Sequence, residues 1–394
     1  YKARYKLLRK AYERSNISQN PEFRTFQEEN AWWLDDYALF MAVKGFFQDE
    51  CWDKWPEDIK KRYGYALDYY REQLYFEIEF QKYMQFEFSI QWKKLKTYAN
   101  ENGIRIIGDI PIYVAYDSAD TWAHPELFQL DEENVPLAVA GCPPDGFAAD
   151  GQLWGNPLYR WDYHRRTGYT WWMQRLSYAF YLYDVVRIDH FRGFDEYFSI
   201  PYGDTTARNG HWEKGPGIEL FHRMKEVLGE RDVIAEDIGY VTDSVRQMVF
   251  ESGFPGMKVF EFAFDSRDTG CAGDYLPHNY PVNSVVYTGT HDNATLIGWY
   301  QDIPKEGREM LRDYIHDYTT SDRSLHWSVI CRVMGSPARI CMIPMQDYLG
   351  LNNTCRINTP STLGTNWKWR LLDGEFTSDL QNKIKKLVRI YQRN

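Results

Sequence analysis

The chain has 394 residues, of which 44% are hydrophobic and 26% are charged, and its formal net charge is −10. This length and composition fit one large barrel with insertions or two to three ordinary domains, and they exclude a disordered chain. The negative charge argues against a broad phosphate-binding surface, so we expect no nucleic acid as a partner.

Three further features narrow the class of protein. Aromatic residues make up 17% of the chain, including 15 Trp and 30 Tyr, which fits core packing or stacking against sugar rings. The six cysteines show no CxxC spacing, which is typical of reduced thiols in a cytoplasmic protein. No apolar run approaches the length of a membrane span, and the N-terminus lacks the apolar segment of a signal peptide.

The first 100 residues have a helical pattern. The segment 29–47 is apolar on all sides, which predicts a helix buried among others. The segment 69–100 predicts one long helix, because an apolar stripe recurs in steps of four residues. We interpret this stripe as core packing; its members are Phe76, Phe80, Met84, Phe88 and Trp92, followed by Leu95.

From residue 104 onward, apolar β-rich runs alternate with helical segments, which indicates a parallel sheet. The predicted strands are 104–109, 184–189, 232–236, 257–262, 284–289 and 339–345. The stretch 115–165 is predicted to be a long irregular loop, and loops of that length are usually functional. A closed (β/α)8 barrel needs eight strands. Two strands therefore either escape this count or precede the chain, and the missing initiator Met favours the second explanation.

Three of the predicted strands end in or shortly before an acidic residue: Asp189, Glu236 and Asp292. A buried strand rarely ends in a charge without a purpose, because burying a carboxylate is costly. In (β/α)8 barrels the active site lies at the carboxyl ends of the strands. Glycoside chemistry is the reaction class that most needs clustered carboxylates. The pattern therefore predicts a carboxylate active site on an α/β barrel.

The spacing around two of these residues suggests roles. Arg187 and Asp189 are two residues apart on a strand, so their side chains share a face. An arginine at that place keeps a carboxylate ionised, as a nucleophile requires, although a structural ion pair has the same pattern. Glu236 and Asp237 point to opposite faces, and the sequence does not decide which one faces inward. A general acid needs a raised pKa, which the charge of Asp189 could supply to Glu236.

Other chemistries find little support. His291 precedes Asp292 and could donate to sugar hydroxyls, although a His-Asp pair is more often structural. Asp109 closes the first predicted strand within a turn-like Gly-Asp-Ile-Pro sequence. The chain has no HExxH, GxGxxG, Walker A or GxSxG motif, and its nine His lack metal-ligand spacing.

Together the motifs resemble the 4-α-glucanotransferases (amylomaltases or disproportionating enzymes) of glycoside hydrolase family 77. The ordered set runs across about residues 100–370 and is far more specific than any single motif. The matching segments are GDIPIYVAYDSADTWAHPELF, AGCPPDGFAADGQLWGNPLYRWDYH, VVRIDHFRGF, IAEDIGYVTDSV, FPGMKVFEFAF, TGTHDNATLIGW and RINTPSTLGTNWKWRL.

The resemblance implies a role for each candidate residue. Asp189 would be the nucleophile, Glu236 the general acid/base and Asp292 the transition-state stabiliser. Three residues would hold the nucleophile and the sugar beside it: Asp109, Arg187 and His291. The segment 141–156 would be a loop covering the site, lined by Asp145, Phe147 and Trp154.

The resemblance also implies the reaction and its partners. The enzyme would transfer segments of α-1,4-glucans, such as maltooligosaccharides and amylose, to other glucans or to glucose, and no metal or organic cofactor is implied. The rival hypotheses are an amylase-like retaining hydrolase and a non-catalytic glucan-binding protein. The sequence does not give the oligomeric state.

The chain departs from the family pattern at its start. The family's first two barrel strands have no counterpart, so we expect a (β/α)8 TIM barrel with helical insertions that lacks these strands. Residues 1–100 would be a helical insertion subdomain, and residues 101–394 would be the catalytic part with strands three to eight. A smaller departure is Pro-Ser-Thr at 360–362, where many members have Pro-Gly-Thr.

Overall fold

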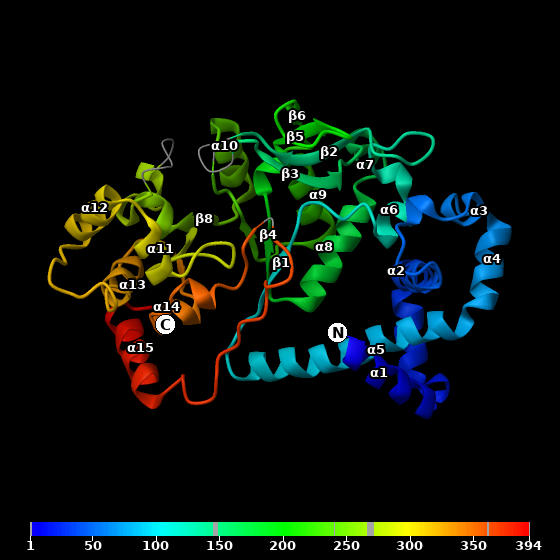
Figure 1. Cartoon of the computed structure of the whole chain (residues 1–394), viewed down its shortest axis with the longest axis horizontal. Coiled ribbons are helices and arrows are strands. Elements are labelled where there is room, and N and C mark those ends of the chain that lie inside the picture. The colour runs from blue at the N-terminus through cyan, green and yellow to red at the C-terminus, as the bar shows by residue number, and fades with distance from the viewer. Residues whose placement is uncertain (1, 145–148, 240, 266–271, 361, 394) are drawn as a thin grey trace. The chain divides into compact units, whose positions relative to one another are not determined.

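The computed structural model describes residues 2–144, 149–239, 241–265, 272–360 and 362–393. The chain divides into two compact units (Figure 1). Unit 1 comprises Tyr1–Pro144, Asp150–Val186 and Glu196–Asp232, and unit 2 comprises Asp145–Ala149, Arg187–Asp195 and Val233–Asn394. Each unit has hydrophobic clusters of its own. None of the helices within the described ranges is both long enough and apolar enough to cross a bilayer.

Helices dominate the first 100 residues of unit 1, as the sequence predicts. The α-helices of unit 1 are α1 (Lys2–Arg14), α2 (Pro21–Phe46), α3 (Glu57–Lys60), α4 (Gly64–Gln73), α5 (Tyr75–Glu101), α6 (Ala119–Ala123), α7 (Trp161–Arg166), α8 (Thr170–Leu182) and α9 (Glu219–Leu228).

Local signals explain where α2 begins and what it buries. The Asn20 side chain caps the helix by accepting a 2.9 Å hydrogen bond from the backbone N–H of Glu22, and Pro21 occupies the first helical position. The predicted buried helix is confirmed in part: Leu34, Ala38, Leu39, Phe40 and Val43 are buried, whereas Trp32 and Phe46 are about half exposed.

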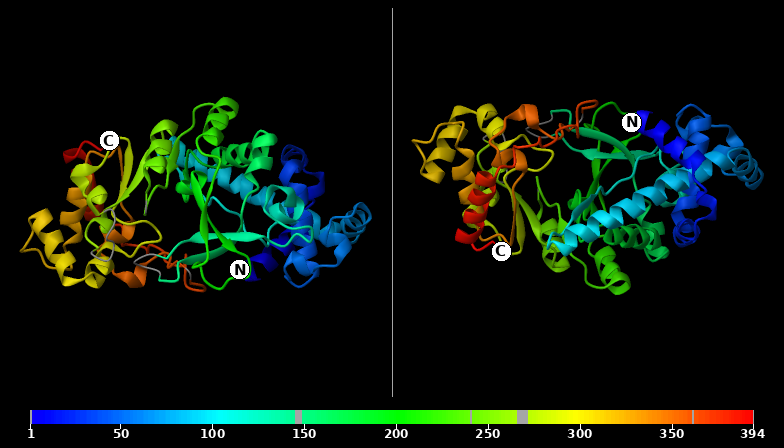
Figure 2. Two further views of the ribbon diagram at one scale, coloured as in Figure 1. Left: turned by 90° about the horizontal axis from the view of Figure 1, so that it is seen from above. Right: turned by 90° about the horizontal axis from the view of Figure 1, so that it is seen from below.

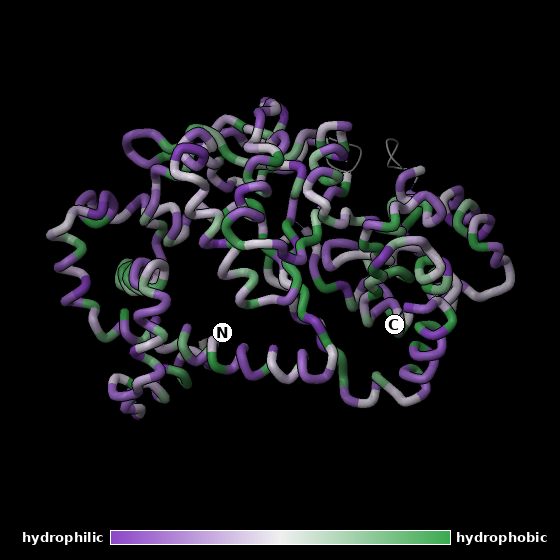
Figure 3. The backbone as a smooth tube through the Cα atoms, turned by 180° about the vertical axis from the view of Figure 1, so that it is seen from behind, coloured by the Kyte–Doolittle hydropathy of each residue, from purple (hydrophilic) through white to green (hydrophobic). Residues whose placement is uncertain are grey.

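The long helix predicted over 69–100 is interrupted at Leu74, where α4 ends and α5 begins. Figure 2 shows α5 itself as one long, straight helix. Its predicted apolar stripe is buried only in part: Phe80 is fully buried, whereas Phe76 and Phe88 are about half exposed. The buried face is rotated toward Tyr83 and Phe86, and Figure 3 shows hydrophilic and hydrophobic residues mixed along the helix.

The stretch 115–165, which the sequence predicts to be irregular, contains two strands of an antiparallel sheet. The four strands have the order β3-β2-β5-β6. They are β2 (Ala138–Cys142), β3 (Gln152–Pro157), β5 (Glu196–Pro201) and β6 (His211–Lys214). Ala140 pairs with Ser199 and Gly141 with Leu153. The prediction was wrong here because the central strand β2 finds its partner β5 more than 50 residues later, and strand propensity depends on such partners.

All six predicted strands are present in a second sheet, with the order β1-β4-β7-β8-β9-β10. They are β1 (Ile107–Ile110), β4 (Val185–Ile188), β7 (Val233–Ala235), β8 (Gly256–Val259), β9 (Ser284–Tyr287) and β10 (Ile340–Met342). The pairs from β7 to β10 are parallel, with Met257 opposite Val285 and Val286 opposite Cys341. Helices separate these strands along the chain, which confirms the predicted α/β class.

Unit 2 places helices around strands β7 to β10. Its α-helices are α10 (Asp243–Ser252), α11 (Leu296–Asp302), α12 (Lys305–Ile315), α13 (His326–Met334), α14 (Met345–Tyr348) and α15 (Ser378–Ile390). A core cluster of unit 2 joins Val286 of β9 to Leu296 and Trp299 of α11 and to Val329 of α13. This core holds the carboxyl ends of the strands, where the candidate residues lie.

Candidate active site

The carboxyl end of β4 carries the pair that the sequence singled out. Arg187 is 6% exposed, and its Nη1 donates a 2.9 Å hydrogen bond to Oδ1 of Asp189. The Nε of Arg187 lies 3.2 Å from the sulfur of Met257 on β8, which holds the plane of the guanidinium. Because Arg187 is buried and held from two sides, it presents a fixed positive charge to the more exposed Asp189 carboxylate.

Glu236 directly follows β7 and faces the same guanidinium. Its Oε1 lies 3.7 Å from Nη2 of Arg187, and its Oε2 accepts a 2.7 Å hydrogen bond from the backbone N–H of His190. Burial and the negative charge of Asp189 raise the pKa of Glu236 well above its usual range, against the opposing effect of Arg187. Arg187, Asp189 and Glu236 are therefore brought together, as the sequence predicts.

The side chain of Asp237 points away from that of Glu236. The sequence left open which of these two neighbours faces Arg187, and the structure shows that Glu236 does. Its Oδ1 accepts a 2.6 Å hydrogen bond from the backbone N–H of Met257. Burial raises the pKa of Asp237 to about 6, and Lys258 opposes that rise. A Cβ on Gly256 would lie 2.6 Å from Oδ2 of Asp237, so glycine is needed where this carboxyl approaches β8. Glu236 is thus the residue of the two that is available for chemistry.

Asp292 lies in the segment after β9 and is held by its neighbours on both carboxylate oxygens. Nε2 of His291 lies 3.1 Å from Oδ2, and the Asn358 side-chain amide donates to Oδ1. Burial raises the pKa of Asp292, but the hydrogen bonds from His291 and Asn358 and the charge of Arg187 outweigh burial, and the pKa falls below its usual value. Asp292 is therefore kept ionised, and Arg187 is near enough to contribute.

Arg356 and Asn358, to which the sequence assigned no role, connect a distant segment to Asp292. Arg356 donates from Nη2 to the backbone carbonyl of Asp292, and from Nε to the carbonyl of Asn358. The Trp367 ring lies 5.2 Å from the ring of His291. No motif marks Arg356 or Asn358 as site residues; only the resemblance of their segment to a known family pointed to this region.

Comparisons with known proteins show which family the chain belongs to. The sequence model of the 4-alpha-glucanotransferase family matches residues 1–375. The chain belongs to this family. It is 47% identical to the 4-alpha-glucanotransferase of Clostridium butyricum over 395 residues, covering 100% of this chain and 80% of that protein. It is 44% identical to the enzyme of Thermus thermophilus, covering 97% of this chain and 77% of that protein.

A solved structure extends the likeness to three dimensions. The amylomaltase from Streptococcus agalactiae in complex with acarbose superposes with a TM-score of 0.94 at 37% identity, covering 100% of this chain and 79% of that one. The family resemblance predicted from the sequence motifs is thereby confirmed. The chain is a 4-alpha-glucanotransferase homologue that carries the predicted carboxylates on its strand ends.

Of the remaining predicted site residues, Asp109 and Trp154 belong to unit 1. Asp109 is the third residue of β1 in unit 1, one residue before the strand ends, and it is exposed. Trp154 is in β3, its ring 6.2 Å from that of Tyr113 and its Nε1 3.1 Å from Oε1 of Gln152. Asp145 and Phe147 lie outside the described residues.

Proposed function

We propose that this chain is a 4-α-glucanotransferase that moves segments of α-1,4-glucans from one glucan to the 4-OH of another, or of glucose. The observation that carries the proposal is the single buried guanidinium of Arg187, which faces both Asp189 and Glu236. Retaining glycoside chemistry needs one ionised and one protonated carboxyl about 5–5.5 Å apart. Two carboxyls that face one guanidinium, one of them with a raised pKa, supply such a pair of protonation states.

In the first step, the Asp189 carboxylate attacks C1 of the donor glucan. The bond between C1 and the glycosidic oxygen breaks, and Glu236 gives its proton to the departing oxygen. A covalent β-glucosyl-enzyme remains. The raised pKa of Glu236 supports the acid role, because the residue is protonated before the step.

In the second step, Glu236 acts as the base and takes the proton from the 4-OH of the acceptor. The acceptor oxygen attacks C1, the bond to Asp189 breaks, and the α-linkage is restored. Glu236 is then protonated again, so the cycle is closed without a further reactant.

The other candidate residues have supporting roles in this proposal. Asp292, ionised and fixed by His291 and Asn358, would bind hydroxyls of the distorted sugar at the reacting carbon. Asp109 would bind the same sugar, and the segment 141–156 with Asp145, Phe147 and Trp154 would cover the site. We also propose that residues 1–100 serve as a helical insertion subdomain of the catalytic part, 101–394.

Incubation with maltotriose tests the proposal. A ladder of longer maltooligosaccharides is expected, and Asp189→Asn should abolish it. The matched control is Asp243→Asn, because Asp243 is an exposed carboxylate on α10 of the same unit. If maltotriose is only cleaved to shorter sugars, the protein is a hydrolase. If the wild type binds maltotriose but does not convert it, the protein is a non-catalytic glucan-binding protein.

A further inference from the structure

Unit 1 contains a groove that the proposed reaction does not use. Three cavities of about 110, 590 and 770 Å³ lie along helices α2, α5 and α8. The first two share Trp32 and Gln174, and the last two share Glu29, Ser89 and Tyr181, so they form one continuous groove. We name it the α2–α8 groove. Its middle part has the volume of an ordinary small-molecule site, and the continuation at both ends suits a chain-like ligand.

One wall of the groove carries a row of aromatic rings. The Trp32 ring lies 6.3 Å from that of Tyr178, which lies 5.9 Å from that of Tyr181. Trp32 is 47% and Tyr181 55% exposed, so both present apolar rings with a polar edge to the solvent. Exposed rings in a row are unusual without a partner, because each leaves a large apolar area in water.

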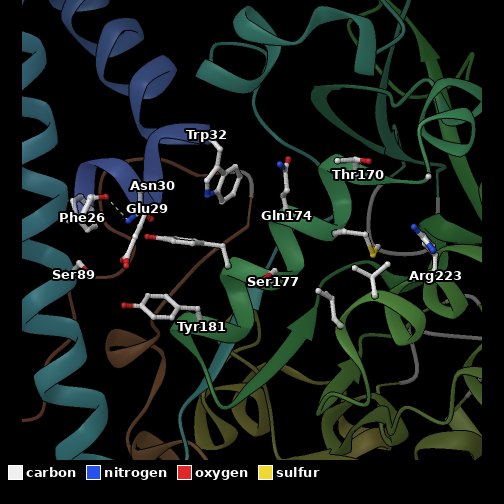
Figure 4. Close-up of a pocket in the computed structure, with 15 residues that line it drawn as sticks. Phe26, Glu29, Asn30, Trp32, Ser89, Thr170, Gln174, Ser177, Tyr181 and Arg223 are labelled. Atoms are coloured by element: carbon white, nitrogen blue, oxygen red, sulfur yellow. Dashed lines mark hydrogen bonds between the residues drawn. The ribbon is translucent and has the colours of Figure 1, made fainter. Parts of the chain in front are cut away.

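Three polar side chains of the groove have no side-chain partner among the described residues. The side chains of Glu29, Gln174 and Ser177 make no hydrogen bond or ion pair with any other residue in the described ranges. Figure 4 shows Glu29 on α2 facing Gln174 and Ser177 on α8 across the cavity. A carboxylate, an amide and a hydroxyl together can both donate to and accept from neutral hydroxyl groups.

We propose that the α2–α8 groove binds a second segment of α-1,4-glucan, apart from the segment that reacts. The choice of glucan rests on the proposed function. The faces of a glucose ring carry C–H groups that pack on aromatic rings, and its edge carries hydroxyls that match the groove's polar groups. A nucleic acid is disfavoured because acidic residues outnumber basic ones along the groove. The basic residues are Lys93, Lys94 and Arg223, and the acidic ones are Glu22, Glu29, Asp36, Glu101 and Asp120.

Binding at a second place on the same chain would serve long substrates. A polymer held by the groove stays at a raised effective concentration for the active site, because the second binding event becomes intramolecular. A long glucan offers a separate segment to each place, whereas maltotriose has only three glucose units to offer. The groove therefore acts on long glucans and leaves short ones unaffected.

The test uses Trp32→Ala with Tyr181→Ala in an Asp189→Asn background, so that no glucan is consumed. Migration is measured in native gels that contain soluble amylose. Loss of the two stacking rings is expected to weaken amylose retention by roughly 5- to 10-fold. Ser177→Trp places a large side chain in the cavity from an exposed position. This variant should also weaken amylose retention, although both aromatic rings are still present. The matched control is Phe250→Ala, at a residue that is 81% exposed on α10, and it should migrate as its parent.

In the active background, the groove variants should raise KM for amylose and leave the rate with maltotriose unchanged. Amylose retention and KM equal to those of the parent would overturn the inference. A dimer in light scattering that the groove variants dissociate would also overturn it, because the groove would then bind a second copy. Failure of the proposed function is seen separately, as absence of a maltotriose ladder with the wild type.

Discussion

The carboxylate of Glu236 accepts a 2.7 Å hydrogen bond from the backbone N–H of His190, the residue directly after Asp189. His190 has a φ of 50° and a ψ of 49°, the left-handed conformation that residues other than glycine rarely adopt. This turn of the chain aims an N–H at Glu236. The segment that supplies the proposed nucleophile thus also orients the proposed acid, and the guanidinium of Arg187 on β4 lies near both carboxylates.

Asp189→Asn is predicted to lower the pKa of Glu236. After burial, the negative charge of Asp189 is the largest cause that raises this pKa, and asparagine removes the charge while keeping the shape. NMR titration of ¹³C-labelled glutamate in wild type and variant measures the shift. Asp243→Asn, an exposed carboxylate change in the same unit, should leave the titration unchanged. An unaltered titration in Asp189→Asn would show that burial alone sets the pKa.

Arg187→Lys is predicted to lower kcat for maltotriose disproportionation by about 10²-fold, with a smaller change in KM. A lysine ammonium is a single point charge and cannot face Asp189, Glu236 and the sulfur of Met257 together. Circular dichroism checks that the variant is folded. Arg389→Lys, on the exposed face of α15, is the matched control. Wild-type kcat in Arg187→Lys would mean that the charge suffices without the fork geometry.

The strands and their carboxylates could be predicted because both signals are local. The runs before Asp189 and Glu236 are short, apolar and β-branched, and each ends in a charge that an ordinary strand would not bury. The antiparallel sheet was missed for the opposite reason. In this sheet β2 lies between β3 and β5, and its partner β5 is distant in sequence, so no local pattern shows the pairing.

The contacts of Asp292 show a second limit of sequence reasoning. Asn358 reaches Asp292 across 66 positions of sequence, from a segment with no strand or helix of its own in the described residues. Its position depends on the path of the chain after β10, which no periodicity encodes. In the same way, the apolar stripe in the sequence does not show that α4 and α5 are separated at Leu74, or that Tyr83 and Phe86 lie on the buried face of α5.

Asn358→Asp is predicted to reduce activity at neutral pH by roughly 10- to 100-fold, the value of one hydrogen bond to a charged group. The new carboxylate would stand against Oδ1 of Asp292, which now accepts from the Asn358 amide. Two like charges in contact cannot both stay ionised at little cost, so the pKa of one of them rises. Initial rates between pH 5 and pH 8 test this, because activity of the variant should recover in part where one carboxyl is protonated.

The control for that prediction is Asn352→Asp, since Asn352 is in the same unit and its side chain bonds only Thr354 among the described residues. It should keep the wild-type pH profile. A profile of Asn358→Asp that is uniformly low at all pH values would indicate a displaced segment 356–367 in place of charge repulsion.

Glu261→Gln is predicted to stabilise the folded protein at neutral pH. Glu261 follows β8, is 3% exposed, and its Oε1 has no hydrogen-bond partner among the described residues. Burial and the neighbouring Asp347 raise the pKa of Glu261 well above its usual range, although Arg356 opposes them. The folded state therefore holds a proton on Glu261 where the unfolded chain has already released it.

The sign of the pH dependence follows from that proton. Below the unfolded pKa of about 4.3, both states are protonated and Glu261 contributes no pH dependence. Above it, the folded state binds more protons than the unfolded state, so the free energy of unfolding falls as pH rises, by up to about 1.4 kcal/mol per pH unit. Glutamine cannot titrate. Its advantage over the wild type should thus grow between pH 5 and pH 7 in urea unfolding curves, and the exposed Glu306→Gln on α12 should show no such trend. An advantage that is constant with pH would mean that Glu261 is ionised in the folded protein and paired with Arg356.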